Sequence, residues 1–210
     1  MSAAEVRQYH RDEVIAFRKT GEAFGGLSNM APGFPILVLG QRIRTAEALY
    51  QACRFPHMPQ VQRMILDEIS PMTAKMRSKP YREESRPDWD DVRVPIMKWC
   101  LRAKLAANWS TFSALLLETG DRPIVEDSRK DDFWGAKPEA QHSLEGRNVL
   151  GRLLMELREK LRADPDTLRT VKPVPIADFL LLNRPIGMIE TQTDEQPARP
   201  RSAPAQAAFL

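Results

Sequence analysis

Apolar residues recur every three or four positions over much of this chain, a spacing that puts them on one face of an α-helix. Prolines, glycines and short charged runs separate these stretches and mark the ends of elements. The pattern predicts helices over residues 46–55, 61–69, 71–77, 95–108, 112–118 and 148–162. The last stretch has the most regular stripe, formed by Leu150, Leu153, Leu154, Leu157 and Leu161.

Shorter apolar segments predict a small amount of sheet. Residues 36–44 read as a hairpin that turns at Gly40-Gln41, and residues 124–126 read as a short strand. Residues 1–20 carry a weak apolar pattern that fits a short strand or helix. The predicted fold class is therefore α+β, predominantly helical, with one domain and a small β-sheet.

The remaining segments lack a clear period. Residues 78–92 are charged and irregular, and residues 131–135 and 136–146 read as loops. Residues 176–182 predict one further helix docked on the domain, because their apolar residues are bounded by polar ones. The Pro-, Ala-, Arg- and Gln-rich residues 191–210 predict a disordered tail.

Composition excludes several classes of protein. Lys and Arg number 31 against 28 Asp and Glu, and a net charge of +3 is too small to argue for nucleic acid by itself. No apolar run is long enough for a membrane span, so no membrane partner is expected. Cys53 and Cys100 form no paired motif, which favours a reducing cytoplasm. The three histidines lie far apart, and no metal or other cofactor is predicted.

Lys104 stands out because its position conflicts with its charge. In the helix predicted over 95–108, Lys104 falls about 20° from Met97, on the face that Cys100 and Leu101 share. A lysine on a core face loses hydration, which lowers the pKa of its amine and makes a neutral nucleophile available. The alternative is a lysine whose stem packs while its ammonium reaches water.

Other polar and aromatic residues lie outside the core stripes. Trp89 and Trp134 occur beside aspartates, where an indole can either stack on a ring-shaped ligand or fill the edge of the core. Glu47 is in the first turn of its helix, where the helix dipole alone would favour a carboxylate. Glu126 ends the predicted strand over 124–126, and Asp131 and Asp132 come a few residues later. Two carboxylates near a C–N bond can act as general acid and charge stabiliser.

Several short motifs, taken together and in order, resemble the NADAR domain family, the YbiA-like N-glycosidases. They are Phe24-Gly25-Gly26-Leu27-Ser28-Asn29-Met30, Thr45-Ala46-Glu47-Ala48-Leu49-Tyr50-Gln51-Ala52, Arg86-Pro87-Asp88-Trp89, Met97 with Arg102-Ala103-Lys104, residues 116–120, Ile124-Val125-Glu126, Asp132-Phe133-Trp134-Gly135 and residues 146–158. The resemblance implies a catalytic domain over residues 22–162. Residues 1–21 would then be an N-terminal extension, and residues 163–190 a C-terminal one ahead of the tail.

The resemblance also implies an activity. Members of this family cleave bonds between C1 of a ribose and an amine, either in phosphoribosylated intermediates of riboflavin synthesis or in ADP-ribosylated guanine, including guanine in DNA. The expected partner is thus a small nucleotide-like substrate or an ADP-ribosylated nucleic acid. The family's catalytic residues would map onto Lys104, Glu47 and Asp132, and the residues that line the substrate pocket onto Ser28, Asn29, Tyr50, Trp89, Glu126, Trp134, Gly135 and Asn148.

Two mechanisms fit this chemistry. A ribose bonded to an exocyclic amine can open its ring to an imine, which Lys104 would attack to form a Schiff base, with Glu47 or Asp132 moving protons. The alternative is direct hydrolysis, in which Glu47 or Asp132 stabilises an oxocarbenium-like state and Lys104 binds phosphate.

Three functions remain open at this point. The first two are hydrolysis of phosphoribosylated amines and hydrolysis of ADP-ribosylated guanine. In the second, the arginine-rich residues 77–93 or the pair Arg199 and Arg201 would hold DNA. The third is a non-catalytic module that senses NAD or ADP-ribose.

Overall fold

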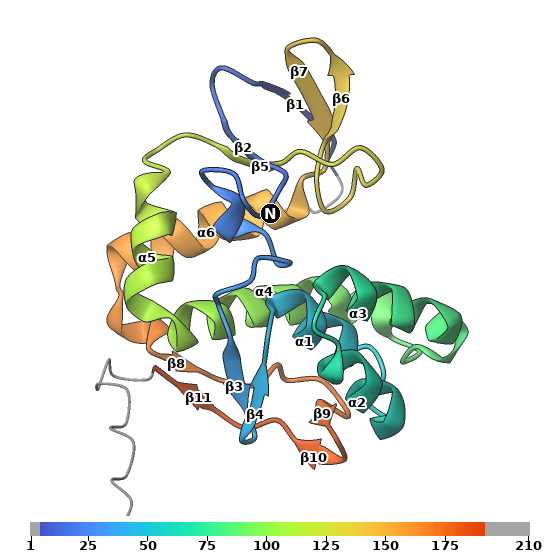
Figure 1. The fold of residues 1–210 in the computed structure, drawn as a ribbon. Helices are drawn as coiled ribbons and strands as arrows, with labels where there is room; N and C mark the ends of the chain where they lie inside the picture. The colour runs from blue at the N-terminus through green and yellow to red at the C-terminus, as the bar shows by residue number, and fades with distance from the viewer. Residues whose placement is uncertain (1–4, 192–210) are drawn as a thin grey trace, which may run out of the picture.

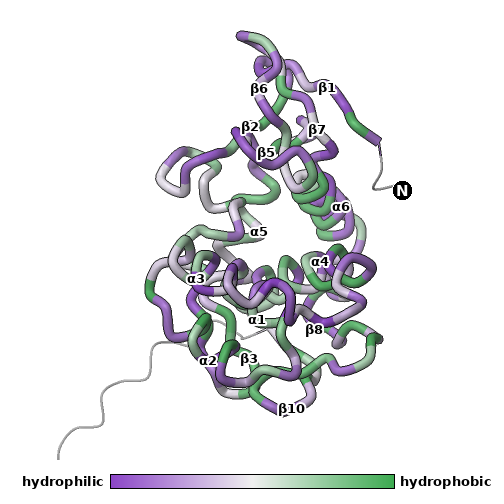
Figure 2. Tube along the Cα trace, turned by 90° about the vertical axis from the view of Figure 1, so that its right-hand side faces the viewer, coloured by the Kyte–Doolittle hydropathy of each residue, from purple (hydrophilic) through white to green (hydrophobic). Residues whose placement is uncertain are grey.

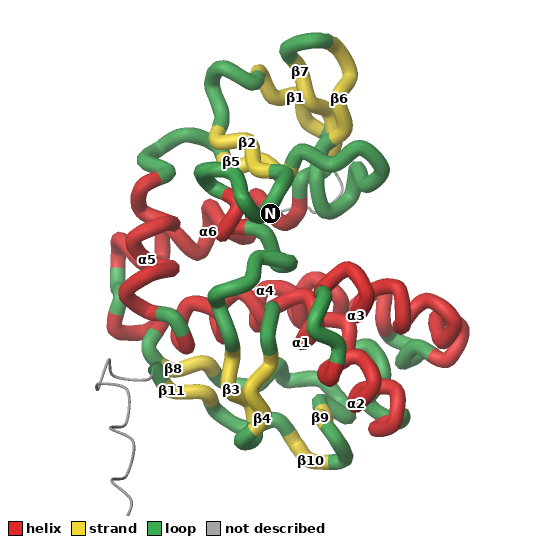
Figure 3. Tube along the Cα trace, in the orientation of Figure 1, coloured by secondary structure: helices red, strands yellow, loops and turns green. Residues whose placement is uncertain are grey.

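The computed structural model describes residues 5–191 and has α+β architecture, which confirms the predicted fold class. Figure 1 places one group of strands at each end of the molecule, with helices between them, and Figure 3 shows the same division by colour. The helices are α1 (Ala46–Ala52), α2 (Pro59–Asp67), α3 (Pro71–Ser78), α4 (Trp89–Ala107), α5 (Trp109–Glu118) and α6 (Val149–Ala163). Three short 3-10 helices are η1 (Gly25–Leu27), η2 (Lys79–Glu84) and η3 (Asp166–Leu168).

Within residues 5–191, the strands form one three-stranded sheet and four two-stranded ones. They are β1 (Arg7–His10), β2 (Ile15–Phe17), β3 (Ile36–Val38), β4 (Gln41–Ile43), β5 (Ile124–Glu126), β6 (Lys137–Ala140), β7 (Ser143–Gly146), β8 (Thr170–Val171), β9 (Leu180–Leu181), β10 (Arg184–Pro185) and β11 (Ile189–Glu190). The three-stranded sheet has the order β1-β7-β6, and β3 pairs with β4 as the predicted hairpin. The parallel pair β2 and β5 aligns Phe17 with Glu126, so the strand pairing fixes the backbone position of Glu126 relative to β2.

Local signals account for where the helices begin. Thr45 caps α1, because its side-chain oxygen accepts a hydrogen bond of 3.2 Å from the Ala48 amide. Ser70 caps α3 in the same way, and Pro71 occupies its first turn. Four leucines of the predicted stripe of α6 are buried and Leu153 is half-buried, and hydrophobic and hydrophilic positions alternate along this helix in Figure 2.

Three sequence-based predictions about secondary structure are wrong. The helix predicted from Pro95 begins six residues earlier, at Trp89, because Asp90 and Asp91 in its first turn favour a helix N-terminus and Pro95 is accommodated inside. Residues 136–146 form the β6–β7 hairpin instead of a loop. Residues 176–182 form no helix, because Asp178 and Leu182 adopt positive φ angles and the chain turns into β9.

The predicted disordered tail lies outside the described residues, apart from Thr191. No helix among residues 5–191 combines the length and the apolar run that are needed to cross a lipid bilayer. A large hydrophobic cluster connects α1, α4, α5 and α6, and a smaller one lies under the β1-β7-β6 sheet.

The segment after α6 packs against the helices through a few specific contacts. The Gln62 side chain, fully buried on α2, donates hydrogen bonds to the carbonyls of Ala52 and Leu180 and accepts one from the Leu182 amide. Phe179 lies edge-on against Trp99 of α4, with ring centroids 4.9 Å apart. Gln62 therefore ties β9 to the helical layer that carries α1.

Replacing Gln62 with Ala should lower the free energy of unfolding by about 2 to 4 kcal/mol, because two carbonyls and one amide lose their partner in the core. Urea unfolding measures this change. Gln60→Ala, at an exposed position of the same helix, is the control and should change stability little. Equal losses in the two variants would contradict the role of Gln62.

Candidate active site

One polar cavity of about 440 Å³ lies where α1, α3 and α4 meet the loop after β5. Its lining includes Ser28, Asn29, Glu47, Tyr50, Trp89, Glu126 and Trp134, seven of the residues predicted for the site. The rest of the lining is Met30, Gln51, Arg54, Lys75, Arg82, Asp90, Arg93, Met97, Ser128, Asp131 and Leu150. The sequence motifs thus converge on one place, although they are up to about a hundred residues apart.

Glu47 and Glu126 bring two carboxylates to the cavity. Glu47 is buried, its amide donates to the Asn29 carbonyl at 3.0 Å, and its Oε1 accepts a hydrogen bond of 2.9 Å from Gln51. The Lys75 Nζ atom lies 3.9 Å from that same oxygen. Burial, followed by the nearby charges of Glu47 and Asp131, raises the pKa of Glu126 to about 7. Near neutral pH Glu126 can therefore hold a proton beside the carboxylate of Glu47, a division of roles typical of acid–base pairs.

Asn148 does not line the cavity but positions Glu126. It is fully buried in the left-handed conformation, with φ of 47°. Its Nδ2 donates to the Ile124 carbonyl at 2.8 Å, and its Oδ1 accepts from the Glu126 amide at 3.1 Å. The side chain therefore replaces a neighbouring strand along one edge of β5.

Gly135 does not line the cavity either; it allows two backbone segments to approach each other closely. A Cβ atom at this position would lie 2.5 Å from the Glu126 carbonyl oxygen and 2.9 Å from Ser128, closer than real Cβ atoms come. Its own carbonyl accepts the Asn148 amide at 3.0 Å. Any larger residue would push the loop away from β5.

Three aromatic rings form one wall of the cavity. Tyr50 lies between Trp89 and Trp134, with ring centroids 5.1 Å and 5.6 Å away. Burial raises the pKa of the Tyr50 phenol far above its ordinary value, so the ring stays uncharged. Such a wall can stack on a planar heterocycle, as expected for both tryptophans.

The predicted burial of Lys104 is confirmed, but this lysine does not line the cavity. Its Nζ donates to the carbonyls of Gly26 at 2.6 Å and Ser28 at 3.0 Å. The rings of Phe34 and Phe112 lie 4.6 and 4.4 Å from the same atom. Burial lowers the pKa of Lys104 to about 7. Lys104 therefore lies behind the cavity wall and holds the backbone of Ser28 in place.

Asp132 does not join the other carboxylates either. Its side chain is 63% exposed and forms an ion pair of 2.6 Å with Lys137, which holds the pKa of Asp132 below its usual value. The neighbouring Asp131 lines the cavity instead, and its Oδ1 accepts the amides of Phe133 and Trp134. The turn between these two aspartates sends their side chains in different directions.

The sequence analysis missed Lys75 and the three arginines Arg54, Arg82 and Arg93 as cavity residues. For Arg82 and Arg93, the arginine-rich composition of residues 77–93 is the one indication in the sequence. Lys75 gave no signal, because α3 has no pronounced apolar stripe. Arg199 and Arg201, predicted to hold DNA, lie outside the described residues. Within residues 5–191, no three His, Cys, Asp or Glu side chains gather closely enough to hold a metal ion.

The comparisons with known proteins agree with this fold. The family model of the NADAR domain matches residues 16–162, so the chain belongs to the NADAR domain family. N-glycosidase YbiA of Escherichia coli (strain K12) is 33% identical over 162 residues, which cover 76% of this chain and 95% of that protein. The relatives support an enzyme of the N-glycosidase class.

Two further similarities refine this picture. The NMR structure of the E. coli protein YbiA superposes with a TM-score of 0.63 at 33% identity, covering 75% of this chain and 89% of that one. Riboflavin biosynthesis protein VVA0006 of Vibrio vulnificus (strain YJ016) is 35% identical over 158 residues, 75% of this chain but only 41% of that protein. The shared region is therefore a complete domain in one relative and part of a longer chain in the other.

The lowered pKa of Lys104 has a measurable effect on stability. Between pH 7 and the ordinary lysine pKa of 10.5, the unfolded chain binds a proton that the folded one does not, so stability should rise with pH in this range. The difference in unfolding free energy between wild type and Lys104→Met should therefore grow by about 1.4 kcal/mol per pH unit at most.

Urea unfolding of both proteins from pH 6 to pH 10 measures this difference, and the variant corrects for all other titrating groups. Parallel curves for the two proteins would show that Lys104 keeps its ordinary pKa.

Proposed function

We propose that this enzyme hydrolyses the bond between C1 of a phosphorylated ribose and an exocyclic amine. The observation that supports this most strongly is the meeting of Glu47, Glu126 and Lys75 in one cavity with an aromatic wall. The first substrate to consider is a phosphoribosylaminopyrimidine, since one relative is named a riboflavin biosynthesis protein. ADP-ribosylated guanine is the second, because its modified ribose is bonded to an exocyclic amine in the same way.

In the proposed mechanism, Lys75 replaces Lys104 as the nucleophile, because Lys75 lines the cavity and Lys104 does not. Protonated Glu126 gives its proton to the ring oxygen, the C1–O bond breaks, and an iminium forms between C1 and the substrate nitrogen. Glu47 takes a proton from the paired Lys75 ammonium, and the amine that results adds to C1. Glu47 is suited to this step by its 3.9 Å distance from Lys75 Nζ.

The second half of the cycle returns each group to its starting state. The substrate nitrogen takes up the proton from Glu47 and leaves as the free amine, so that C1 remains bonded to Lys75 as a Schiff base. Water adds to C1, the bond to Lys75 breaks, the Lys75 nitrogen returns one proton to Glu126, and the released sugar aldehyde closes its ring. The net reaction consumes one water and yields one amine and one ribose phosphate.

Turnover is tested by incubating the full chain with a phosphoribosylaminopyrimidine and, separately, with an oligonucleotide that carries ADP-ribosylated guanine. Mass spectrometry detects the released amine and sugar. Release from either substrate supports the proposal and identifies the amine. Binding of both substrates without release from either would contradict it and favour the NAD- or ADP-ribose-sensing module.

Glu126→Gln should lower kcat about 100-fold or more, because the amide cannot donate the proton that opens the ring. The wild-type kcat should fall as pH rises through about 7, because the protonated carboxyl is the active form. Glu118→Gln, an exposed glutamate at the end of α5, is the control and should keep the wild-type profile. A wild-type kcat that stays constant from pH 6 to pH 8.5 would exclude Glu126 as this acid.

The Schiff base predicts a covalent product. Borohydride added during turnover should reduce the imine and leave the sugar attached to Lys75, as peptide mass spectrometry would show. Lys79→Met, an exposed change four residues away, should trap normally, whereas Lys75→Met should not. An adduct on Lys104 would restore the sequence-based assignment. Turnover with no adduct on any lysine would favour direct hydrolysis by the two glutamates.

A further inference from the structure

Three arginines, Arg54, Arg82 and Arg93, line the cavity without playing any part in the chemistry described above. Arg54 follows α1, Arg82 belongs to η2 and Arg93 to α4, so the fold gathers them from three places along the chain. In contrast, the neighbouring Arg86 makes three hydrogen bonds, two to Asp88 and one of 2.7 Å to the Ala177 carbonyl. The three cavity arginines have no comparable set of partners.

Their positive charge is only partly balanced. Among the salt bridges of residues 5–191, Arg93 has a single long contact of 3.6 Å with the exposed Asp90, and Arg54 and Arg82 have none. The Nε atom of Arg93 is buried without a hydrogen-bond partner. Burial and the neighbouring charge of Arg82 lower the pKa of Arg54. Such an arrangement costs folding free energy unless an anion completes it.

Aromatic rings hold two of these guanidinium groups in place. The Arg54 guanidinium lies 5.0 Å from the centroid of Trp89, and that of Arg93 lies 4.1 Å from the centroid of Phe133. The Arg54 Nε also donates to the Ser85 hydroxyl at 2.6 Å. A guanidinium that stacks by its face keeps in-plane N–H donors available, and this planar fork matches a phosphate group.

The arginines and the carboxylates form two adjoining parts of the cavity. Glu126 is within electrostatic range of Glu47, Asp131 and Lys75, whereas Arg54 is within range of Arg82, Arg93 and the exposed Asp90. Tyr50 lies between the two parts, because its phenol is within electrostatic range of Glu47 on one side and of Arg54 and Arg93 on the other. A ligand lying along Tyr50 can therefore present an anionic end and a reacting end at once.

We propose that Arg54, Arg82 and Arg93 form a subsite for the phosphate on C5 of the ribose whose C1 bond is cleaved. That the ligand is a ribose rests on the proposed function, whereas the anionic subsite rests on the arginines alone. Both candidate substrates carry this phosphate, as a monoester in a phosphoribosylated amine and as part of the diphosphate in ADP-ribose. Such a subsite would allow one cavity to bind either candidate substrate. It predicts that ribosides without the phosphate bind poorly.

Titration calorimetry of the full chain with ribose 5-phosphate and with ribose tests the subsite without requiring turnover. Wild type should bind ribose 5-phosphate at least tenfold more tightly than ribose. Arg82→Gln, at an exposed position outside any described ion pair, should weaken ribose 5-phosphate binding about ten- to a hundredfold. Arg54→Gln should do the same, with circular dichroism checking its fold, and Arg42→Gln on β4 is the matched control and should bind normally.

Equal binding of ribose 5-phosphate by wild type, Arg82→Gln and Arg54→Gln would overturn the subsite, as would equal affinity of wild type for ribose and ribose 5-phosphate. Binding that depends on the arginines, without turnover of any glycosylamine, would keep the subsite and refute the proposed function.

The substrates themselves distinguish the two sources of phosphate. For whichever substrate is hydrolysed, Arg82→Gln should raise KM at least tenfold and change kcat little, whereas a general loss of structure would lower kcat as well. Removing the monoester with phosphatase should abolish the effect of the substitution on the phosphoribosylated amine. If Arg82→Gln left the KM for both substrates unchanged, the assignment of Arg82 to a phosphate subsite would be contradicted.

Discussion

The candidate site depends on the hydrogen bonds by which Asn148 replaces a missing strand beside β5. Its side chain pairs with the Ile124 carbonyl and the Glu126 backbone amide. The backbone N–H of Asn148 donates to the Gly135 carbonyl. A buried amide can satisfy these groups only in one orientation, because its donor and acceptor are distinct. The end of β5 is thereby fixed against the start of α6, and Glu126 is held at the cavity.

The fold brings two carboxylates, those of Glu47 and Glu126, to the same cavity. Glu126 and Glu47 come from β5 and α1, elements that share no backbone pairing, and each reaches the same cavity through its own rigid support. Burial, followed by the nearby charges of Glu47 and Asp131, raises the pKa of Glu126 to about 7, so Glu126 can hold a proton near neutral pH. Lys104 contributes from behind the wall by fixing the Ser28 backbone, and the adjoining Asn29 carbonyl binds the amide of Glu47.

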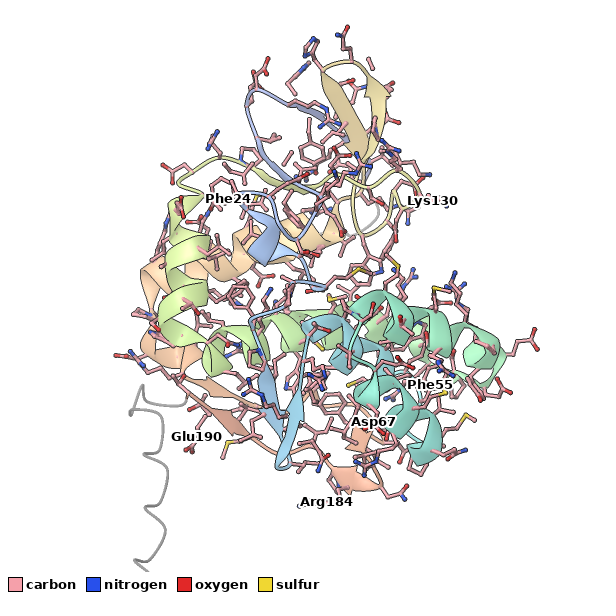
Figure 4. All side chains as sticks on the ribbon, viewed as in Figure 1. Phe24, Phe55, Asp67, Lys130, Arg184 and Glu190 are labelled. Atoms are coloured by element: carbon pink, nitrogen blue, oxygen red, sulfur yellow. The ribbon has the colours of Figure 1, made fainter. Side chains whose placement is uncertain are left out.

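Much of the fold and about half of the site could be predicted from the sequence, for physical reasons that differ by residue. Helical periodicity identified the burial of Lys104, but periodicity reports a core face and does not distinguish packed core from cavity wall. Lys75 has no such signal, since only the tertiary contact of α3 with α1 brings it to Glu47. The β6–β7 hairpin was missed because β6 is mostly exposed and shows no alternation of apolar residues. The loop after β5, which carries Lys130 (labelled in Figure 4), turns one aspartate into the cavity and the next one away.

The proposed acid step depends on a protonated Glu126 near neutral pH, and carbon-13 NMR of the glutamate side-chain carboxyls measures this directly. Labelled wild type is titrated from pH 3 to pH 9, with Glu126→Gln assigning the resonance. The raised pKa of Glu126 predicts that its carboxyl titrates near pH 7. A Glu126 that titrates near the ordinary glutamate value of about 4.3 would contradict it.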